Sequence, residues 1–177
     1  MRMTPIQSVF TFCIVAISFS AFSQEKIAPT DALTVTGLVD KEMTFRVSDL
    51  SAYPSKSIPD VVITNHLGEP RGTAKGLKAI LIKDVLANVS IKTESPKVLS
   101  EFFLSFIAFD GYTVVYSWNE IFNSPTGDNI YLITEKDGKP LAEMSERLLI
   151  ITPTDFKTGR RHIKGLNKIV VARASRP

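Results

Sequence analysis

Cysteine and histidine are both scarce in this chain. Among its 177 residues there is one cysteine, Cys13, and there are two histidines, His66 and His162. Cys13 lies in an N-terminal apolar run that we expect to be removed, which leaves no thiol for a disulfide, a nucleophile or a soft metal. A metal site of His and carboxylates stays open, although neither histidine has a second strong ligand at helical spacing. The sequence therefore predicts no catalytic residue and names no set of metal ligands.

The chain also lacks a strong net charge. It has 21 Lys and Arg against 18 Asp and Glu, a formal charge of +3 at pH 7. A balance of this kind gives no support for nucleic acid or a membrane surface as a partner. One late segment is locally basic, and it contains Lys157, Arg160, Arg161, His162, Lys164 and Lys168. Such a cluster can be a solvated face or an anion site.

A long apolar run occurs only at the N-terminus. Arg2 precedes apolar residues 9–22, and Ala21 and Ser23 supply the small side chains that a signal peptidase reads. This pattern predicts a secretory signal peptide over residues 1–23, with no membrane insertion of the mature chain. We expect a flexible lead-in at residues 24–32 and one domain at residues 33–173.

The remaining sequence reads as many short strands with few helices. Apolar periodicity predicts strands at residues 33–39, 43–47, 61–64, 102–109, 112–116, 129–134, 147–152 and 163–172. The run at 102–109 is apolar throughout, as in a strand buried on both faces. A helix is expected over residues 80–88, short helical turns over 49–53 and 117–120, and a hairpin turn over 136–139. This combination predicts a single compact α+β domain.

A turn-rich loop after the strand at 61–64 is a candidate binding site. Asn65, His66, Glu69 and Arg71 place an amide, an imidazole, a carboxylate and a guanidinium within seven positions. Groups of four different hydrogen-bonding types suit recognition of a flat polar ligand. The alternative is an ordinary surface loop in which Pro70 and glycines serve the turn.

Four further residues join the candidate inventory. Asp110 and Tyr112 flank Gly111 in a bend. Trp118, the one tryptophan, follows a strand end, where it either stacks on a planar ligand or packs at the rim of the core. Arg147 begins a strand, where an arginine either pairs with a carboxylate or donates to a ligand carbonyl.

Seven segments in order resemble the molybdopterin-binding domain of the sulfite oxidase family. They are LTVTGLVDKEMTF, a strand ending VIT before a PRG loop, GLKAILIKDVL, FDGYTVVYSW, DGKPL, ERLLIITP and TGRRHIKGLNKIVV. The resemblance covers residues 33–173 and implies a compact α+β domain with mixed sheets. In the molybdenum enzymes of that family a cysteine after this strand binds the metal, whereas the matching residue here is Asn65. An amide oxygen is a poor substitute for a thiolate on molybdenum, so the resemblance implies a pterin pocket without molybdenum.

An exported domain of this type without its cysteine is similar to periplasmic pterin-binding regulators of the PruR type. That resemblance implies a periplasmic location and a neopterin- or monapterin-like ligand. It also implies a partner, the periplasmic region of a membrane GGDEF/EAL-type receptor that makes or degrades cyclic di-GMP and sets biofilm formation. The alternative is a molybdenum-cofactor oxidoreductase or its accessory subunit, and a third reading is a pterin carrier or interaction module.

A pocket that binds a pterin needs an aromatic face, a hydrogen-bond acceptor for the amino edge of the ring and donors for the ring carbonyl. We assign Trp118 or Tyr112 to stacking and Asp110 or Glu69 to the amino edge. The donors are Asn65, His66, Arg71, Arg147, Arg161 and Lys164. The resemblance also places Arg147, His162 and Lys164 near the pterin or phosphate of the family's cofactor.

Overall fold

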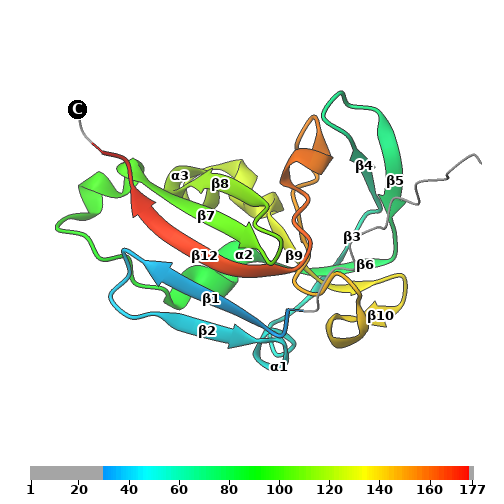
Figure 1. The fold of residues 1–177 in the computed structure, drawn as a ribbon, viewed down its shortest axis with the longest axis horizontal. Coiled ribbons are helices and arrows are strands. Elements are labelled where there is room, and N and C mark those ends of the chain that lie inside the picture. Colours follow the sequence, from blue (N-terminus) through cyan, green and yellow to red (C-terminus); the bar gives the residue numbers. More distant parts are fainter. Residues whose placement is uncertain (1–29, 176–177) are drawn as a thin grey trace, which may run out of the picture.

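The computed structural model describes residues 30–175, which form two larger sheets, a separate β-hairpin and short helices (Figure 1). The predicted signal peptide lies outside the described residues. The strands are β1 (Ala32–Gly37), β2 (Met43–Arg46), β3 (Lys56–Ile58), β4 (Val61–Thr64), β5 (Pro70–Ala74), β6 (Leu77–Leu81), β7 (Phe102–Ala108), β8 (Thr113–Ser117), β9 (Tyr131–Lys136), β10 (Lys139–Pro140), β11 (Ile150–Ile151) and β12 (Leu166–Arg173). The helices are α1 (Val47–Leu50), α2 (Ile82–Val85) and α3 (Trp118–Phe122), and the 3-10 helices are η1 (Leu86–Asn88), η2 (Pro96–Glu101), η3 (Pro125–Asn129), η4 (Leu141–Glu143) and η5 (Thr158–Arg161). In this described part of the chain, no helix has the length and apolar character to cross a membrane.

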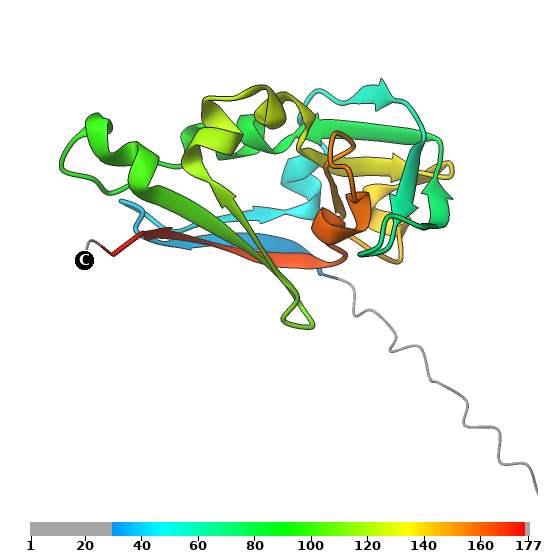
Figure 2. The same cartoon turned by 90° about the horizontal axis from the view of Figure 1, so that it is seen from above.

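The first sheet has the strand order β2-β1-β12-β7-β8, with β1 and β12 parallel and the other pairs antiparallel. The helices cover one of its faces, as the view from above shows (Figure 2). Phe102, Leu104 and Phe106 of β7 point to the covered face and are buried, while the residues between them are half-exposed. The prediction of a strand buried on both faces was therefore wrong, because the sheet is covered on one side only.

The second sheet has the order β10-β9-β6-β3, with β11 paired to the other part of β9. The helix predicted over residues 80–88 is shorter than expected, because Ile80 and Leu81 pair with Leu132 and Tyr131 in β9. Helical structure begins only at Ile82. Strand pairing therefore overrides the helical spacing of the first apolar residues in this run.

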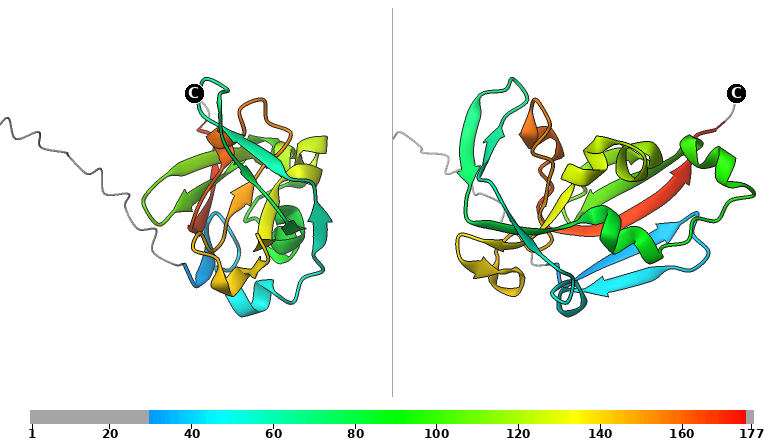
Figure 3. Two further views of the ribbon diagram at one scale, coloured as in Figure 1. Left: turned by 90° about the vertical axis from the view of Figure 1, so that its right-hand side faces the viewer. Right: turned by 180° about the vertical axis from the view of Figure 1, so that it is seen from behind.

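Strands β4 and β5 form a two-stranded hairpin that stands beside the rest of the molecule, next to the segment that carries η5 (Figure 3). Val61 and Ala74, which pair across this hairpin, are buried in a core cluster that includes Tyr131, Leu149 and Ile151. The base of the hairpin is thus fixed to the second sheet by apolar burial. The other core cluster lies between the first sheet and helices α2 and α3.

Two glycines serve different purposes in the late part of the chain, one a positive φ and the other a close backbone approach. Gly165 adopts a φ of 66°, and β12 begins one residue later, which shortens the strand predicted from residue 163. A Cβ atom on Gly159 would lie 1.8 Å from the backbone oxygen of Thr64. Gly159 therefore allows η5 to lie directly against β4.

Candidate functional site

A cleft of about 230 Å³ lies between the β4–β5 hairpin and the body of the domain. Its lining is Ile63, Arg71, Gly72, Thr73, Ala74, Lys136, Glu146, His162 and Lys164. The structure thus brings together three of the predicted site residues, Arg71, His162 and Lys164, from segments about 90 positions apart. Lys136 and Glu146 also line the cleft and were missed, because neither stands out from its hairpin or loop in the sequence.

The hairpin supplies the apolar wall of the cleft. Ile63 and Gly72 are opposite each other in the ladder, so a side chain at either position projects from the same face of the hairpin. That face also carries Val61 and Ala74, which are buried against the body. Ile63 consequently lies over the cleft, while Gly72 leaves open space beside it, with no atom within 4 Å of a Cβ built there.

The body supplies an ion pair. Lys136 Nζ lies 2.7 Å from Glu146 Oε1, and the two side chains are 22% and 15% exposed. Burial alone would raise the pKa of the Glu146 carboxyl, but hydrogen bonds from Lys136 and Ser145 outweigh it and lower the pKa to about 2. Glu146 is therefore a carboxylate at neutral pH and a fixed acceptor at the cleft.

His162 is an uncharged imidazole in this cleft. Burial, and after it the positive charges of Lys164 and Lys136, lower the pKa of the His162 side chain from 6.5 to about 4. A neutral imidazole offers one donor and one acceptor. Together with Arg71 and Lys164 as donors and Glu146 as acceptor, the cleft presents both kinds of hydrogen-bonding group to a ligand.

The His162 imidazole predicts a loss of stability in mild acid. Its pKa is lower in the folded protein than in the unfolded chain, so the unfolded chain takes up the proton first, and the free energy of unfolding falls as pH drops from 6.5 towards 4. His162→Gln should remove this part of the pH dependence. The contribution of Glu146 is lost at lower pH, between 4.5 and about 2. Urea unfolding of both proteins across the upper window measures the difference, and parallel pH profiles would contradict the assignment.

The residues at the hairpin tip form a turn instead of lining the cleft. Asn65 Oδ1 accepts hydrogen bonds from the backbone N–H groups of Leu67 (2.9 Å) and Glu69 (3.0 Å). Its amide nitrogen donates to Glu69 Oε2 at 2.8 Å. His66 is exposed at the same tip. Of the loop residues singled out from the sequence, only Arg71 reaches the cleft.

This use of Asn65 bears on the fit of a molybdenum cofactor. The Asn65 side chain, which the sequence resemblance matched to the family's cysteine, has both its oxygen and its nitrogen engaged within the turn, so it does not fit the role of a metal ligand. Within residues 30–175, no three His, Cys, Asp or Glu side chains are grouped as a metal site would require. The cleft itself offers hydrogen-bond donors and acceptors beside an apolar wall, the kinds of group that line small-molecule sites.

Asp110, Tyr112 and Arg161 lie outside the lining of the cleft. Asp110 accepts a hydrogen bond from the backbone N–H of Tyr112, and the Tyr112 hydroxyl donates to the carbonyl of Arg160 at 2.8 Å. Arg161 binds both oxygens of Asp155 and donates to Glu120 Oε1 at 2.9 Å. These three residues hold the β7–β8 hairpin and η5 in place.

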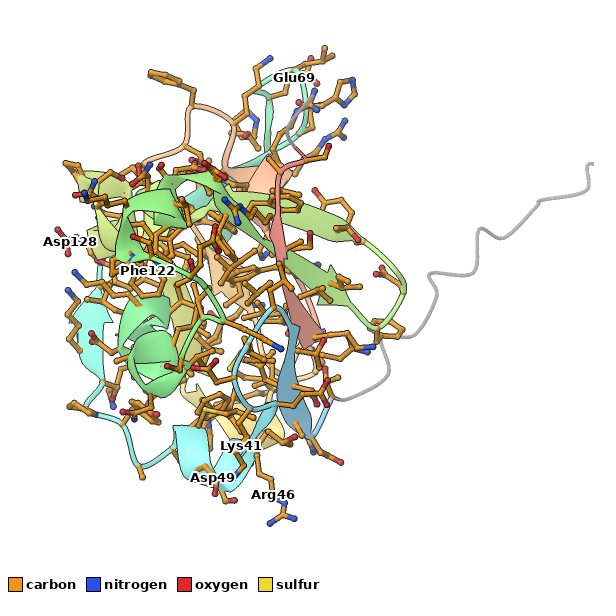
Figure 4. All side chains as sticks on the ribbon, turned by 90° about the vertical axis from the view of Figure 1, so that its left-hand side faces the viewer. Lys41, Arg46, Asp49, Glu69, Phe122 and Asp128 are labelled. Carbon is orange, nitrogen blue, oxygen red and sulfur yellow. The ribbon has the colours of Figure 1, made fainter. Side chains whose placement is uncertain are left out.

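Trp118 and Arg147 are also placed elsewhere. Trp118 packs against the main core, with its ring centroid 5.5 Å from that of Phe122, and it lines a separate groove of about 450 Å³. In Figure 4, Phe122 lies well below the hairpin tip marked by Glu69. Arg147 forms an ion pair with Asp31. Of the alternatives given for these two residues, the structure shows core packing for Trp118 and pairing with a carboxylate for Arg147.

Comparison with known proteins defines the fold. No protein-family model matches the chain, and no curated protein matches it by sequence. Among solved structures, the chain is similar to the sulfane dehydrogenase SoxCD from Paracoccus pantotrophus, with a TM-score of 0.58 and 14% sequence identity. The match covers 82% of this chain and 40% of that chain, so the chain spans less than half of its structural neighbour.

The similarity confirms the predicted fold. The chain is a single compact α+β domain with a sulfite oxidase-like fold. Its strands and short helices agree with the α+β class expected from the sequence.

Proposed function

We propose that this chain is a periplasmic pterin-binding signalling protein. The observation that carries the proposal is the cleft beside the β4–β5 hairpin, where neutral His162, the Glu146 carboxylate and the cations Arg71 and Lys164 converge. The ligand is a small pterin of the neopterin or monapterin kind. The resemblance to periplasmic regulators supports the same ligand class and location.

The chemistry of the cleft suits a pterin edge. The pyrimidine ring of a pterin carries an amino group, which needs a hydrogen-bond acceptor. It also carries a carbonyl, which needs hydrogen-bond donors. Glu146 supplies an acceptor of fixed charge, and Lys164 and Arg71 supply donors. In this proposal the apolar side chain of Ile63 lies against the flat face of the pterin ring. It takes the role that the sequence analysis assigned to Trp118 or Tyr112.

The turn at Asn65 supports a ligand without molybdenum. In this proposal Asn65 holds the tip of the β4–β5 hairpin and so makes no contact to a metal. The cleft still has room for the organic ring. A molybdenum cofactor, when bound to a protein of this fold, supplies redox chemistry at the metal. In this chain the cleft residues bind and orient a heterocycle.

The signalling role requires a partner that senses the ligand. We propose the periplasmic region of a membrane GGDEF/EAL-type receptor, whose cytoplasmic part makes or degrades cyclic di-GMP and thereby controls biofilm formation. Pterin occupancy must favour one state of the complex over another, since equal affinity for both states would transmit nothing.

Analysis of the native ligand tests the proposal. The protein should be purified from periplasm, extracted for mass spectrometry and analysed for molybdenum on the same sample. We expect a free pterin near one equivalent and molybdenum at trace level. Molybdenum near one equivalent would support the oxidoreductase instead, and the absence of both would support an interaction module.

A further inference from the structure

Strand β8 is an open edge strand of the first sheet. It comes last in the strand order β2-β1-β12-β7-β8, so β7 is its one hydrogen-bonded neighbour among the described strands (Figure 1). Thr113 and Val115 of β8 are exposed, Val115 to 53%. An edge strand presents a row of backbone N–H and C=O groups with which a strand of another molecule can pair.

The register of β7 and β8 shows which backbone groups face outwards. The N–H of Ala108 donates to the carbonyl of Tyr112 at 2.9 Å, and the register continues along both strands without a shift. Bonded and non-bonded residue pairs alternate in an antiparallel ladder, so the N–H and C=O groups of Thr113, Val115 and Ser117 point away from β7. Within residues 30–175, the backbones of Thr113 and Val115 have no hydrogen-bond partner on that side.

Strand β8 lacks the residues that protect an edge strand from pairing. Its sequence, TVVYS, contains neither a charged residue nor a proline. The strand orders of the two larger sheets also end in β2, β3 and β10, and these strands contain Arg46, Lys56 and the pair Lys139–Pro140 respectively. Charges and prolines oppose pairing with another molecule, so β8 is the edge strand of these sheets that is most open to a new partner.

We propose that β8 pairs with the β8 strand of a second copy of this chain, antiparallel and centred on Val115. A two-fold axis at Val115 places this residue opposite its equivalent, and it places Thr113 opposite Ser117 of the second copy. Facing β-branched side chains and facing hydroxyl side chains both stabilise a strand pair, and no like charges meet. Because β8 is complementary to itself, the argument favours a second copy over an unrelated strand. This inference goes beyond the proposed function and does not rest on it.

The pairing leaves the contacts within each copy unchanged. The N–H of Ser117 keeps its hydrogen bond to Glu120 Oε2 at 2.8 Å. The new hydrogen bonds join the two Val115 residues to each other and the N–H of Thr113 to the carbonyl of Ser117 in the second copy. No residue of β8 lines the cleft, so each copy keeps its own cleft. Five paired residues make a small interface, and we expect a Kd roughly in the micromolar range.

Sedimentation equilibrium of the processed full chain tests the proposal, at protein concentrations from about 1 μM to about 1 mM. The mass should rise from one copy to two. Val115→Pro should weaken dimerisation at least tenfold, because proline removes the N–H at the centre of the pairing and breaks no bond to β7. The matched control is Val115→Thr, which keeps the N–H and the β-branched side chain and should dimerise as the wild type does. Val115→Lys, which keeps the N–H but adds a charge to the edge, should also weaken dimerisation.

Cysteine cross-linking tests the register, since the processed chain is expected to contain no cysteine. Val115→Cys should be linked between copies by a short bifunctional thiol reagent, because the Cα atoms of a bonded pair lie about 5.5 Å apart. Thr113→Cys should not be linked to itself, since its two copies lie roughly 14 Å apart, four residues at about 3.4 Å each. A mixture of Thr113→Cys and Ser117→Cys should be linked.

Each outcome supports or overturns the pairing. A wild-type protein that stays a single copy at the highest concentration would overturn it. Dimers that survive both Val115→Pro and Val115→Lys would assign self-association to another surface. Loss of the dimer in Val115→Thr would show that the apolar side chain, and not the backbone, holds the copies together. Cross-linking of Thr113→Cys as fast as that of Val115→Cys would exclude the register.

Discussion

Replacing Arg161 with methionine should lower the free energy of unfolding by about 3 kcal/mol. The guanidinium neutralises Asp155, whose side chain is 15% exposed, and Glu120, which is 40% exposed. Methionine keeps apolar contact with the Tyr116 ring but leaves both carboxylates without their cation. Removing one partner of a buried ion pair costs more than the pair itself contributes, because the remaining charge stays desolvated.

The adjacent Arg160 provides a matched control. Its side chain is exposed, and the Tyr112 hydroxyl binds only its backbone carbonyl. Arg160→Met should therefore change stability by less than about 0.5 kcal/mol, as surface substitutions do. Urea denaturation of the three proteins measures the effect. A loss below about 1 kcal/mol for Arg161→Met would show that the cluster is solvated and does not fix the segment between β11 and η5.

Local sequence patterns predicted most of the strands, but they did not predict which faces of the sheets are covered by other elements. The strand at residues 61–64 and the helical turn after Ser117 agree with the structure, because an apolar run and a capping serine act over a few neighbouring residues. The apolar periodicity of residues 80–88 predicted one helix, whereas pairing with β9 extends β6 to Leu81. The apolar periodicity of a single segment does not show whether that segment pairs with a distant strand.

The candidate site shows the same limit. The sequence shows that the loop at residues 65–71 is polar and rich in turn residues. The same pattern is typical both of a ligand contact by Asn65 and of a turn held by Asn65, and the structure has the turn. His162 and Lys164 lie beside Arg71 because η5 packs on β4, a contact that depends on Thr158 and Gly159. Nothing in the local sequence joins Lys136 and Glu146 to this set.

Filling the cleft should abolish pterin binding. Gly72 lines the cleft, shares the inward face of the hairpin with Ile63 and leaves open space at its Cβ. Gly72→Trp therefore places an indole where the ligand would lie, and an aromatic residue suits a strand position. We expect neopterin affinity to fall by at least tenfold, about 1.4 kcal/mol, with little change in the thermal midpoint.

The groove beside Trp118 provides the opposing control. Ala87 is exposed and lines that groove of about 450 Å³, so Ala87→Trp fills it and leaves the cleft unchanged. If the ligand stacks on Trp118, one of the two stacking residues offered by the sequence, this variant should lose binding and Gly72→Trp should not. The pair of variants thus distinguishes the two places at which a pterin could lie.

Calorimetric titration of neopterin into the wild-type protein, Gly72→Trp and Ala87→Trp tests the central claim most directly. We predict one-to-one binding by the wild type and by Ala87→Trp, and no measurable heat of binding for Gly72→Trp. Binding that persists in Gly72→Trp would contradict the assignment of the cleft beside the β4–β5 hairpin as the pterin site.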